Sequence, residues 1–172
     1  MSDDGEFTEL DSVANNANAE MPRGHKSRIE SYGEHYNWYA ATAESGKYDM
    51  APLASSTSSD SICPSGWQLA TSSGNESWGR LLGTYSISSG TSTENVNAIK
   101  GLPFILSFSG TYGSLDGVEK YLGTSGHYWT SVASNTATST TAFHLYFDAS
   151  GGLYAAGASG KMTGFTIRCV KK

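Results

Sequence analysis

Few residues of this chain have the types and spacing that acid–base or metal chemistry requires. His144 and Asp148 would be a base and its orienting carboxylate, but four residues along a strand separate them by roughly 13 Å, too far for such a relay. His25, His35 and His127 are scattered, with no His-x-x-x-His spacing and no third ligand nearby. We therefore expect no catalytic residues, no metal site and no enzymatic activity.

Cofactor and calcium sites also lack their sequence signals. No glycine-rich phosphate-binding motif follows a predicted strand. Calcium-dependent sugar binding needs several carboxylate and amide oxygens close together, yet Asp148 is the only carboxylate between His127 and Lys172. Asp116 or Glu119, with backbone carbonyls, would be the candidates for a structural calcium ion. Nothing in the sequence supports that ion, and no cofactor is expected.

The two cysteines, Cys63 and Cys169, match no Cys-x-x-Cys spacing, which argues against a metal knuckle or a thioredoxin-like site. They are either paired with each other or buried as thiols. A bridge would close a loop of about 107 residues, worth on the order of 4 to 5 kcal/mol in the chain-entropy model. It would suit an exported or virion-borne protein.

Length and composition limit the class of protein. The 172 residues fit one domain. Charged residues make up 16% and the net charge is −5, so the chain lacks the basic surface that nucleic acid requires. No apolar run approaches the roughly 18 to 20 residues that span a bilayer, so no membrane insertion is expected. The 20 glycines, 10 tyrosines and 4 tryptophans favour a turn-rich domain that contains strands and large aromatic anchors.

Hydrophobic periodicity predicts two helices. The first runs from Asn75 to Tyr85, with Asn75 as its N-cap and apolar residues recurring at helical spacing. The second, shorter helix covers residues 93–100 and places Val96 and Ile99 on one side.

The last third of the chain predicts strands at residues 126–131, 142–148 and 164–170. In the second of these, strict alternation predicts one core face and one outward face. The core face would comprise Phe143, Leu145 and Phe147, and the outward face His144, Tyr146 and Asp148. Helices in the first half and strands in the last third predict an α+β domain.

Four ordered segments resemble the Fibrobacter succinogenes major paralogous domain, a family related to the C-type lectin-like fold. They are residues 36–43 (YNWYAATA), 62–69 (ICPSGWQL), 126–131 (GHYWTS) and 164–170 (GFTIRCV). Such domains also resemble the variable proteins of diversity-generating retroelements, in which a stretch ending near a motif like residues 165–169 is hypermutated. The chain departs from the family at Ala70, where Pro is usual, and at His127, where Tyr is common, which makes position 127 a candidate variable position.

The resemblance implies a C-type lectin-like α+β fold with two helices and a mostly antiparallel sheet that is closed by the C-terminal strand. It divides the chain into a polar N-terminal tail or stalk at residues 1–30 and a ligand-binding domain at residues 31–172. The variable region would lie at about residues 127–168. The implied fold brings the N- and C-terminal strands side by side, where Cys63 and Cys169 could form a disulfide.

The function that the resemblance implies is ligand binding without catalysis, by the hypervariable product of a diversity-generating retroelement. The partner would be a protein or a cell-surface ligand, and the domain would be extracellular, on a cell surface or on a virion surface. The alternatives are an invariant structural or adhesive surface module and a glycan-binding lectin. The implied ligand-binding face comprises His127, Val132, Ser134, Asn135, Thr136, Thr138, His144, Tyr146, Asp148, Tyr154, Ala156, Ala158, Ser159 and Lys161.

The four tryptophans could form a platform on which carbohydrate stacks. Each of them, however, lies in a segment of the resemblance or on an apolar helix stripe, and large aromatic residues supply most of the buried area in a domain with few aliphatic ones. We therefore assign Trp38, Trp67, Trp78 and Trp129 to the core.

Overall fold

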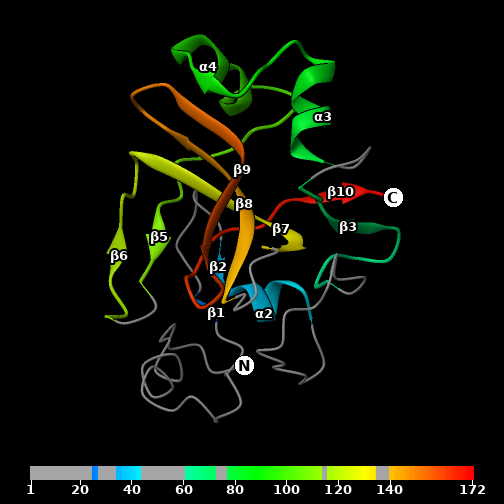
Figure 1. The fold of residues 1–172 in the computed structure, drawn as a ribbon, viewed down its shortest axis with the longest axis vertical. Coiled ribbons are helices and arrows are strands. Elements are labelled where there is room, and N and C mark those ends of the chain that lie inside the picture. Colours follow the sequence, from blue (N-terminus) through cyan, green and yellow to red (C-terminus); the bar gives the residue numbers. More distant parts are fainter. Residues whose placement is uncertain (1–24, 27–33, 44–60, 73–76, 114–115, 135–139) are drawn as a thin grey trace.

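The structure is a computed structural model, shown in Figure 1. It describes residues 25–26, 34–43, 61–72, 77–113, 116–134 and 140–172. Within the expected tail at residues 1–30, the described part is the short strand β1 (His25–Lys26), which pairs with β2 (His35–Tyr36). The rest of that tail lies outside the described residues.

The fold is α+β, as expected, but the described residues contain three helices rather than two. The additional helix is the short α2 (Trp38–Ala41), which sequence periodicity cannot indicate because it is a single turn. Helix α3 (Trp78–Thr84) and helix α4 (Thr93–Lys100) correspond to the two expected helices. No helix in the described part of the chain is long and apolar enough to cross a membrane.

Each helix begins where a side-chain oxygen accepts a hydrogen bond from an amide three residues later. Asn37 caps α2, Ser77 caps α3 and Ser92 caps α4. Such caps satisfy amides that have no partner within the helix. Asn75 is expected to cap the helix that corresponds to α3. That expectation is wrong, because Ser77 caps α3; Asn75 itself lies outside the described residues.

The main sheet is antiparallel and has the strand order β4-β9-β8-β7. Its strands are β4 (Gly90–Thr91), β7 (Ser125–Ala133), β8 (Thr141–Asp148) and β9 (Gly152–Gly160). Strands β7 and β8 are expected from the sequence. Residues 152–160, where the sequence predicts no strand, form β9, which pairs with β8 from Thr141 to Phe147.

The expectation that the C-terminal strand closes this sheet is wrong. Strand β10 (Cys169–Lys171) pairs with β3 (Trp67–Leu69) in a separate two-stranded sheet, and β5 (Thr111–Tyr112) pairs with β6 (Glu119–Lys120) in another. Figure 1 shows these two ribbons on either side of the main sheet.

The segment before β10 crosses a face of the main sheet instead of extending its edge. Phe165 and Thr166 form single bridges to Tyr36 and Tyr128. The buried Phe165 ring lies 4.4 Å from the Trp129 ring, centroid to centroid. The expected continuous strand at residues 164–170 is thus replaced by isolated bridges at residues 164–166 and the short strand β10.

Two cores lie on opposite faces of the main sheet, because successive residues of a strand point to opposite sides. On one face, Leu145 and Phe147 pack with Trp78 of α3 and Ile99 of α4. On the other face, Trp129 packs with Trp38, Leu69 and Phe165. Figure 1 shows α3 and α4 at one end of the sheet and α2 at the other.

The tryptophan assignment is correct for three of the four residues. Trp38, Trp78 and Trp129 are fully buried. Trp67 is 45% exposed, which contradicts the expected core position. It lies at the start of the short β3, beside an apolar groove of about 220 Å³ that Arg168 and Lys171 also line.

Cys63 and Cys169 form a disulfide, with their Cα atoms 5.8 Å apart. The alternative of two buried thiols is thereby excluded. The bridge fastens the segment before β3 to β10, so the two-stranded sheet is held by both hydrogen bonds and a covalent link.

We predict that replacing both cysteines with alanine lowers the free energy of unfolding by about 4 to 5 kcal/mol, because the bridge closes a loop with a sequence separation of 106 residues. Urea unfolding in the absence of reductant measures this difference. Reductant should destabilise the wild-type protein to a similar extent and leave the double variant unchanged. Equal stability of the oxidised wild type and the variant would contradict the prediction.

Candidate functional site

A hollow of about 380 Å³ lies where β7 begins and β8 ends. Ser125 and His127 of β7 and Tyr146 and Asp148 of β8 line it. The turn before β7 adds Tyr121 and Thr124, and the turn after β8 adds Ala149 and Ser150. These residues meet because the antiparallel register places Ser125 opposite Asp148 and His127 opposite Tyr146.

Two tyrosines form an exposed pair beside the hollow. Tyr146 and Tyr154 are direct cross-strand partners on β8 and β9, and their rings stack with centroids 5.9 Å apart. Tyr154 is 48% exposed, whereas Tyr146 is partly buried. Directly paired residues lie on one face of a sheet, so both rings belong to one surface.

His127 connects this pair to the core. Its ring lies 5.0 Å from the Tyr146 ring, 4.7 Å from the Phe165 ring and 5.3 Å from the His144 ring, centroid to centroid. Its Nε2 is 3.0 Å from Ser125 Oγ. A continuous series of ring contacts therefore runs from Tyr146 through His127 to the buried Phe165.

The expectation that His144 faces outward is wrong. His144 is only 5% exposed, and its ring lies 4.7 Å from the Phe165 ring. It is the cross-strand partner of Trp129 and of Gly157, where a Cβ would lie 3.1 Å from the His144 ring. Alternation correctly predicts which face His144 occupies, but that face is covered by the segment that carries Phe165.

Both histidines are held in the neutral form. Burial, followed by the nearby His144 and His35, lowers the pKa of His127 to about 3. Burial lowers the pKa of His144 to about 4. Within the described structure, Nδ1 of His127 and Nδ1 of His144 are buried with no hydrogen-bond partner, so no carboxylate contacts either nitrogen to stabilise a charged imidazolium.

Asp148 anchors the turn that follows β8. Its Oδ1 accepts hydrogen bonds from the Ser150 amide (2.8 Å), the Ser150 hydroxyl and the Gly152 amide (3.1 Å). Its Oδ2 accepts a hydrogen bond from the Tyr146 hydroxyl. Burial alone would raise the pKa of Asp148, but these hydrogen bonds outweigh burial and lower the pKa to about 2. The carboxylate is therefore charged at neutral pH.

The same contact acts on the phenol. Burial, and then the hydrogen bond to Asp148, raises the pKa of Tyr146 to about 12. The phenol is therefore neutral and donates its proton to the carboxylate. Among the described residues that line the hollow, the histidine is neutral, the Tyr146 phenol is protonated, and the Asp148 carboxylate already accepts several hydrogen bonds, so none of these three is an activated base or nucleophile.

The remaining residues of the expected face are distributed unevenly. Tyr154, Ala156 and Ala158 alternate as exposed positions along β9, while Val132, Ser134 and Ser159 are half-buried. Asn135, Thr136 and Thr138 lie outside the described residues.

The placement of Lys161 on this exposed face is wrong. Its side chain is 5% exposed, and Nζ lies 4.6 Å from the ring centroid of the buried Trp38. The aliphatic stem and the ammonium group thus pack on the second core, where a cation gains from the ring face.

No pattern in the sequence identifies several of the residues that line the hollow. Tyr121 is 64% exposed with φ +60, at the end of the short β6, and Thr124, Ser125 and Ser150 lie in or beside turns. Their types are ordinary for turns. Only the pairing of β7 with β8 brings the two turns together.

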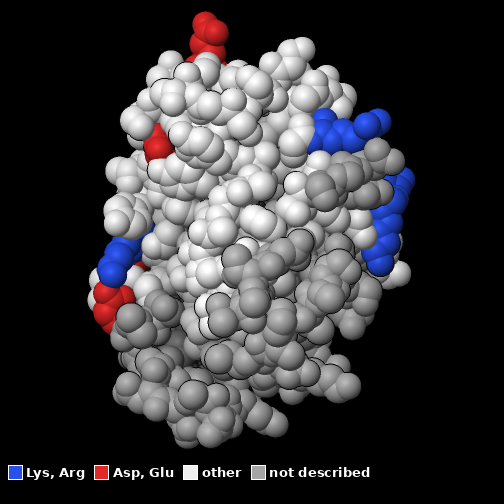
Figure 2. Space-filling model, in the orientation of Figure 1, with Lys and Arg blue, Asp and Glu red and all other residues white. Residues whose placement is uncertain are grey.

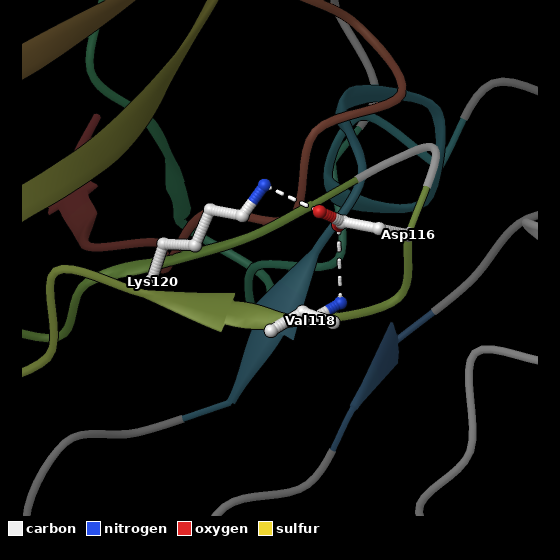
Figure 3. A network of polar contacts seen from close by, with 3 residues as sticks. All are labelled: Asp116, Val118 and Lys120. Atoms are coloured by element: carbon white, nitrogen blue, oxygen red, sulfur yellow. Dashed lines mark hydrogen bonds and ion pairs between the residues drawn. The ribbon is translucent and has the colours of Figure 1, made fainter.

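Asp116, a candidate calcium ligand, makes hydrogen bonds within its own turn. Its carboxylate accepts hydrogen bonds from the Lys120 ammonium and the Val118 amide (Figure 3). Lys120 is the main cause that lowers the pKa of Asp116. Among the residues that the structure describes, no three His, Cys, Asp or Glu side chains converge as a metal site requires. The face in Figure 2 carries its charged side chains near the margins, and its described middle is uncharged.

No protein-family model matches the chain, and no curated protein and no solved structure is significantly similar to it.

We predict that the protein loses stability as the pH falls below about 6.5. The pKa values of His127 and His144 are lower in the folded protein than the ordinary value of about 6.5, so the unfolded chain binds more protons below that pH. Each histidine should contribute about 1.4 kcal/mol per pH unit between about pH 6.5 and its folded pKa. Urea unfolding between about pH 7 and pH 5 measures the slope.

The control is a double variant, His127→Phe with His144→Leu, which should show a shallower slope below about pH 6.5. Both proteins should have the same slope above about pH 7, where the histidines are neutral in both states. A variant as sensitive to acid as the wild type would show that other groups cause the effect.

Proposed function

We propose that this chain is a non-catalytic ligand-binding protein with a C-type lectin-like fold, and that it recognises a protein or cell-surface partner through the end of the main sheet that carries Tyr146 and Tyr154. We further propose that it is the variable product of a diversity-generating retroelement, displayed extracellularly, on a cell surface or on a virion surface. The disulfide between Cys63 and Cys169 supports an oxidising location.

The observation that carries the proposal is the stacking of the exposed Tyr154 on the partly buried Tyr146 beside a hollow. Tyrosine supplies a large, rigid and amphipathic contact area at low conformational cost, which is why antibody-like surfaces are rich in it. Serine and threonine hydroxyls, which adapt to different hydrogen-bond partners, line the same hollow.

A variable surface needs a scaffold that does not depend on it. Leu145, Phe147 and Leu153 are fully buried on the face toward α3 and α4, while Trp38 and Trp129 fill the second core. The outward positions Tyr154, Ala156 and Ala158 contribute little to either core. Substitutions at exposed positions usually change stability by a few tenths of a kcal/mol.

The recognition surface proposed here is smaller than the face expected from the sequence. His144 and Lys161 are buried and belong to the scaffold. The surface consists of His127, Tyr146, Asp148, Tyr154 and Ala156, with Tyr121 and Ser150 added from the turns. Ala158 is not part of it, because its cross-strand partner is Phe143, on the other face of the sheet.

We predict that the double variant Tyr146→Ala with Tyr154→Ala retains its fold, with a melting temperature lowered by about 4 °C or less. The matched control is His144→Ala, which removes a buried ring and should lower the melting temperature at least about twice as much. Differential scanning calorimetry measures both. A tyrosine variant that melts as early as the histidine variant would mean that the pair belongs to the core, and would remove the proposed surface.

The retroelement proposal predicts a specific arrangement in the genome. The DNA beside this gene should encode a reverse transcriptase and contain a near-copy of the 3′ coding region that differs at adenines. Sequencing the flanking DNA checks this. If neither is found, an invariant structural or adhesive module becomes the favoured hypothesis. Glycan-array binding that a chelator abolishes would favour a lectin.

A further inference from the structure

The hollow beside Tyr146 carries a single charge. Among the described residues that line it, Asp148 is the only charged one, and no lysine or arginine is present. The neighbouring His127 is neutral near pH 7, because its pKa is about 3. The electrostatic preference of the hollow is therefore for a cation.

The carboxylate offers charge but at most one free acceptor position, on Oδ2. An ionised carboxylate has about four lone-pair sites. The Ser150 amide, the Ser150 hydroxyl and the Gly152 amide bind Oδ1, and the Tyr146 hydroxyl binds Oδ2. A ligand that needs several hydrogen bonds to this carboxylate would have to displace donors that hold the turn.

Aromatic rings supply the rest of the attraction. Tyr121 and Tyr146 line the hollow, and Tyr154 stacks on Tyr146. The faces of such rings carry negative charge density and attract cations, most strongly where water is excluded. The volume of about 380 Å³ lies within the range of small-ligand sites, roughly 300 to 1,000 Å³.

We propose that this hollow binds a quaternary ammonium group. A trimethylammonium head has a positive charge, an apolar surface and no N–H group, so it gains from the carboxylate and the rings and requires no free acceptor. A primary ammonium or a guanidinium group must replace several hydrogen bonds with water, and Asp148, with at most one free acceptor position, does not provide them. The inference rests on the proposed function for the partner that presents the group.

Two sources of this chemistry can be distinguished. In phosphocholine, the choline group carries a phosphate. The described residues that line the hollow include no lysine or arginine to bind that phosphate. A trimethylated lysine carries no phosphate. We therefore expect choline and N-acetyl-trimethyllysine amide to bind similarly, and phosphocholine to bind more weakly than choline.

The experiment is a titration of the chain with choline chloride, followed by NMR with the tyrosine rings labelled. The matched neutral probe is 3,3-dimethylbutan-1-ol, which has the shape of choline without its charge. Choline should shift the resonances of Tyr121, Tyr146 and Tyr154, and the neutral probe should bind about 5-fold or more weakly. N-acetyl-trimethyllysine amide, phosphocholine, methylammonium and methyl glycosides are titrated in parallel.

Variants separate the charge from the rings. Asp148→Asn retains an oxygen acceptor for the turn but removes the charge, and Tyr121→Leu removes an exposed ring that lines the hollow; each should weaken choline binding about 5-fold or more. The controls are Asp116→Asn, which removes the same unit of charge in the exposed turn between β5 and β6, and Tyr85→Leu, which removes a tyrosine ring that is 53% exposed and does not line the hollow. Neither should change binding.

Tyr146→Phe gives a further test, because it keeps the ring and frees one acceptor position on Asp148. In this variant choline should bind about as before, and methylammonium should bind more tightly than it does to the wild type.

Equal affinity for choline and its neutral analogue, or no choline binding at concentrations on the order of 100 mM, would overturn the proposal. So would binding of methyl glycosides in preference to ammonium compounds, or choline affinity that Asp148→Asn and Tyr121→Leu leave unchanged. These results are independent of the proposed function, because they need no macromolecular partner. Choline binding without any retroelement beside the gene would leave this inference intact and overturn only the retroelement part of the proposed function.

Discussion

The packing of Phe165 across the main sheet is the constraint on which the rest of the structure depends. Its ring contacts the rings of His127, Trp129 and His144, which come from two different strands. The segment that carries it is fixed on both sides, because the Tyr36 amide donates to the Phe165 carbonyl and the Thr166 hydroxyl donates to the His127 carbonyl. One residue thus covers the middle of a face that would otherwise be open to solvent.

The position of Phe165 determines which residues of this face of the sheet are exposed. Where Phe165 covers it, the face is core, and a histidine there must be neutral. Beyond the reach of Phe165, the same face is open, and the residues at that end are a stacked tyrosine pair and a carboxylate that caps a turn. The boundary between scaffold and candidate site therefore runs across β8, between His144 and Tyr146, where the pairing with β9 also shifts in register.

The sequence predicts those parts of the fold whose signal is local. Residues 93–100 form the expected helix because Ser92 caps it and Val96 and Ile99 share one side. Strands β7 and β8 follow from aromatic and alternating residues. Strand β9 has no such signal, since its small residues and glycines have low strand propensity and it is held by its pairing with β8.

The candidate site is only partly predictable for the same reason. Tyr146 and Tyr154 stand out as aromatic residues on outward positions. The burial of His144 and Lys161 depends on Phe165 and Trp38, which are distant in the sequence, so alternation along one strand cannot reveal it. Tyr121 joins the site only through the antiparallel pairing of β7 with β8, which unites two turns.

The disulfide has a consequence for the integrity of the folded chain. Cys63 and Cys169 enclose α3, α4, the main sheet and the candidate site within one covalent ring. A protease that cuts once in an exposed turn inside this ring, such as residues 85–86 after α3, leaves both pieces attached to each other. A single cleavage therefore does not release the aromatic surface from the rest of the molecule, an advantage for any protein that must persist among extracellular proteases.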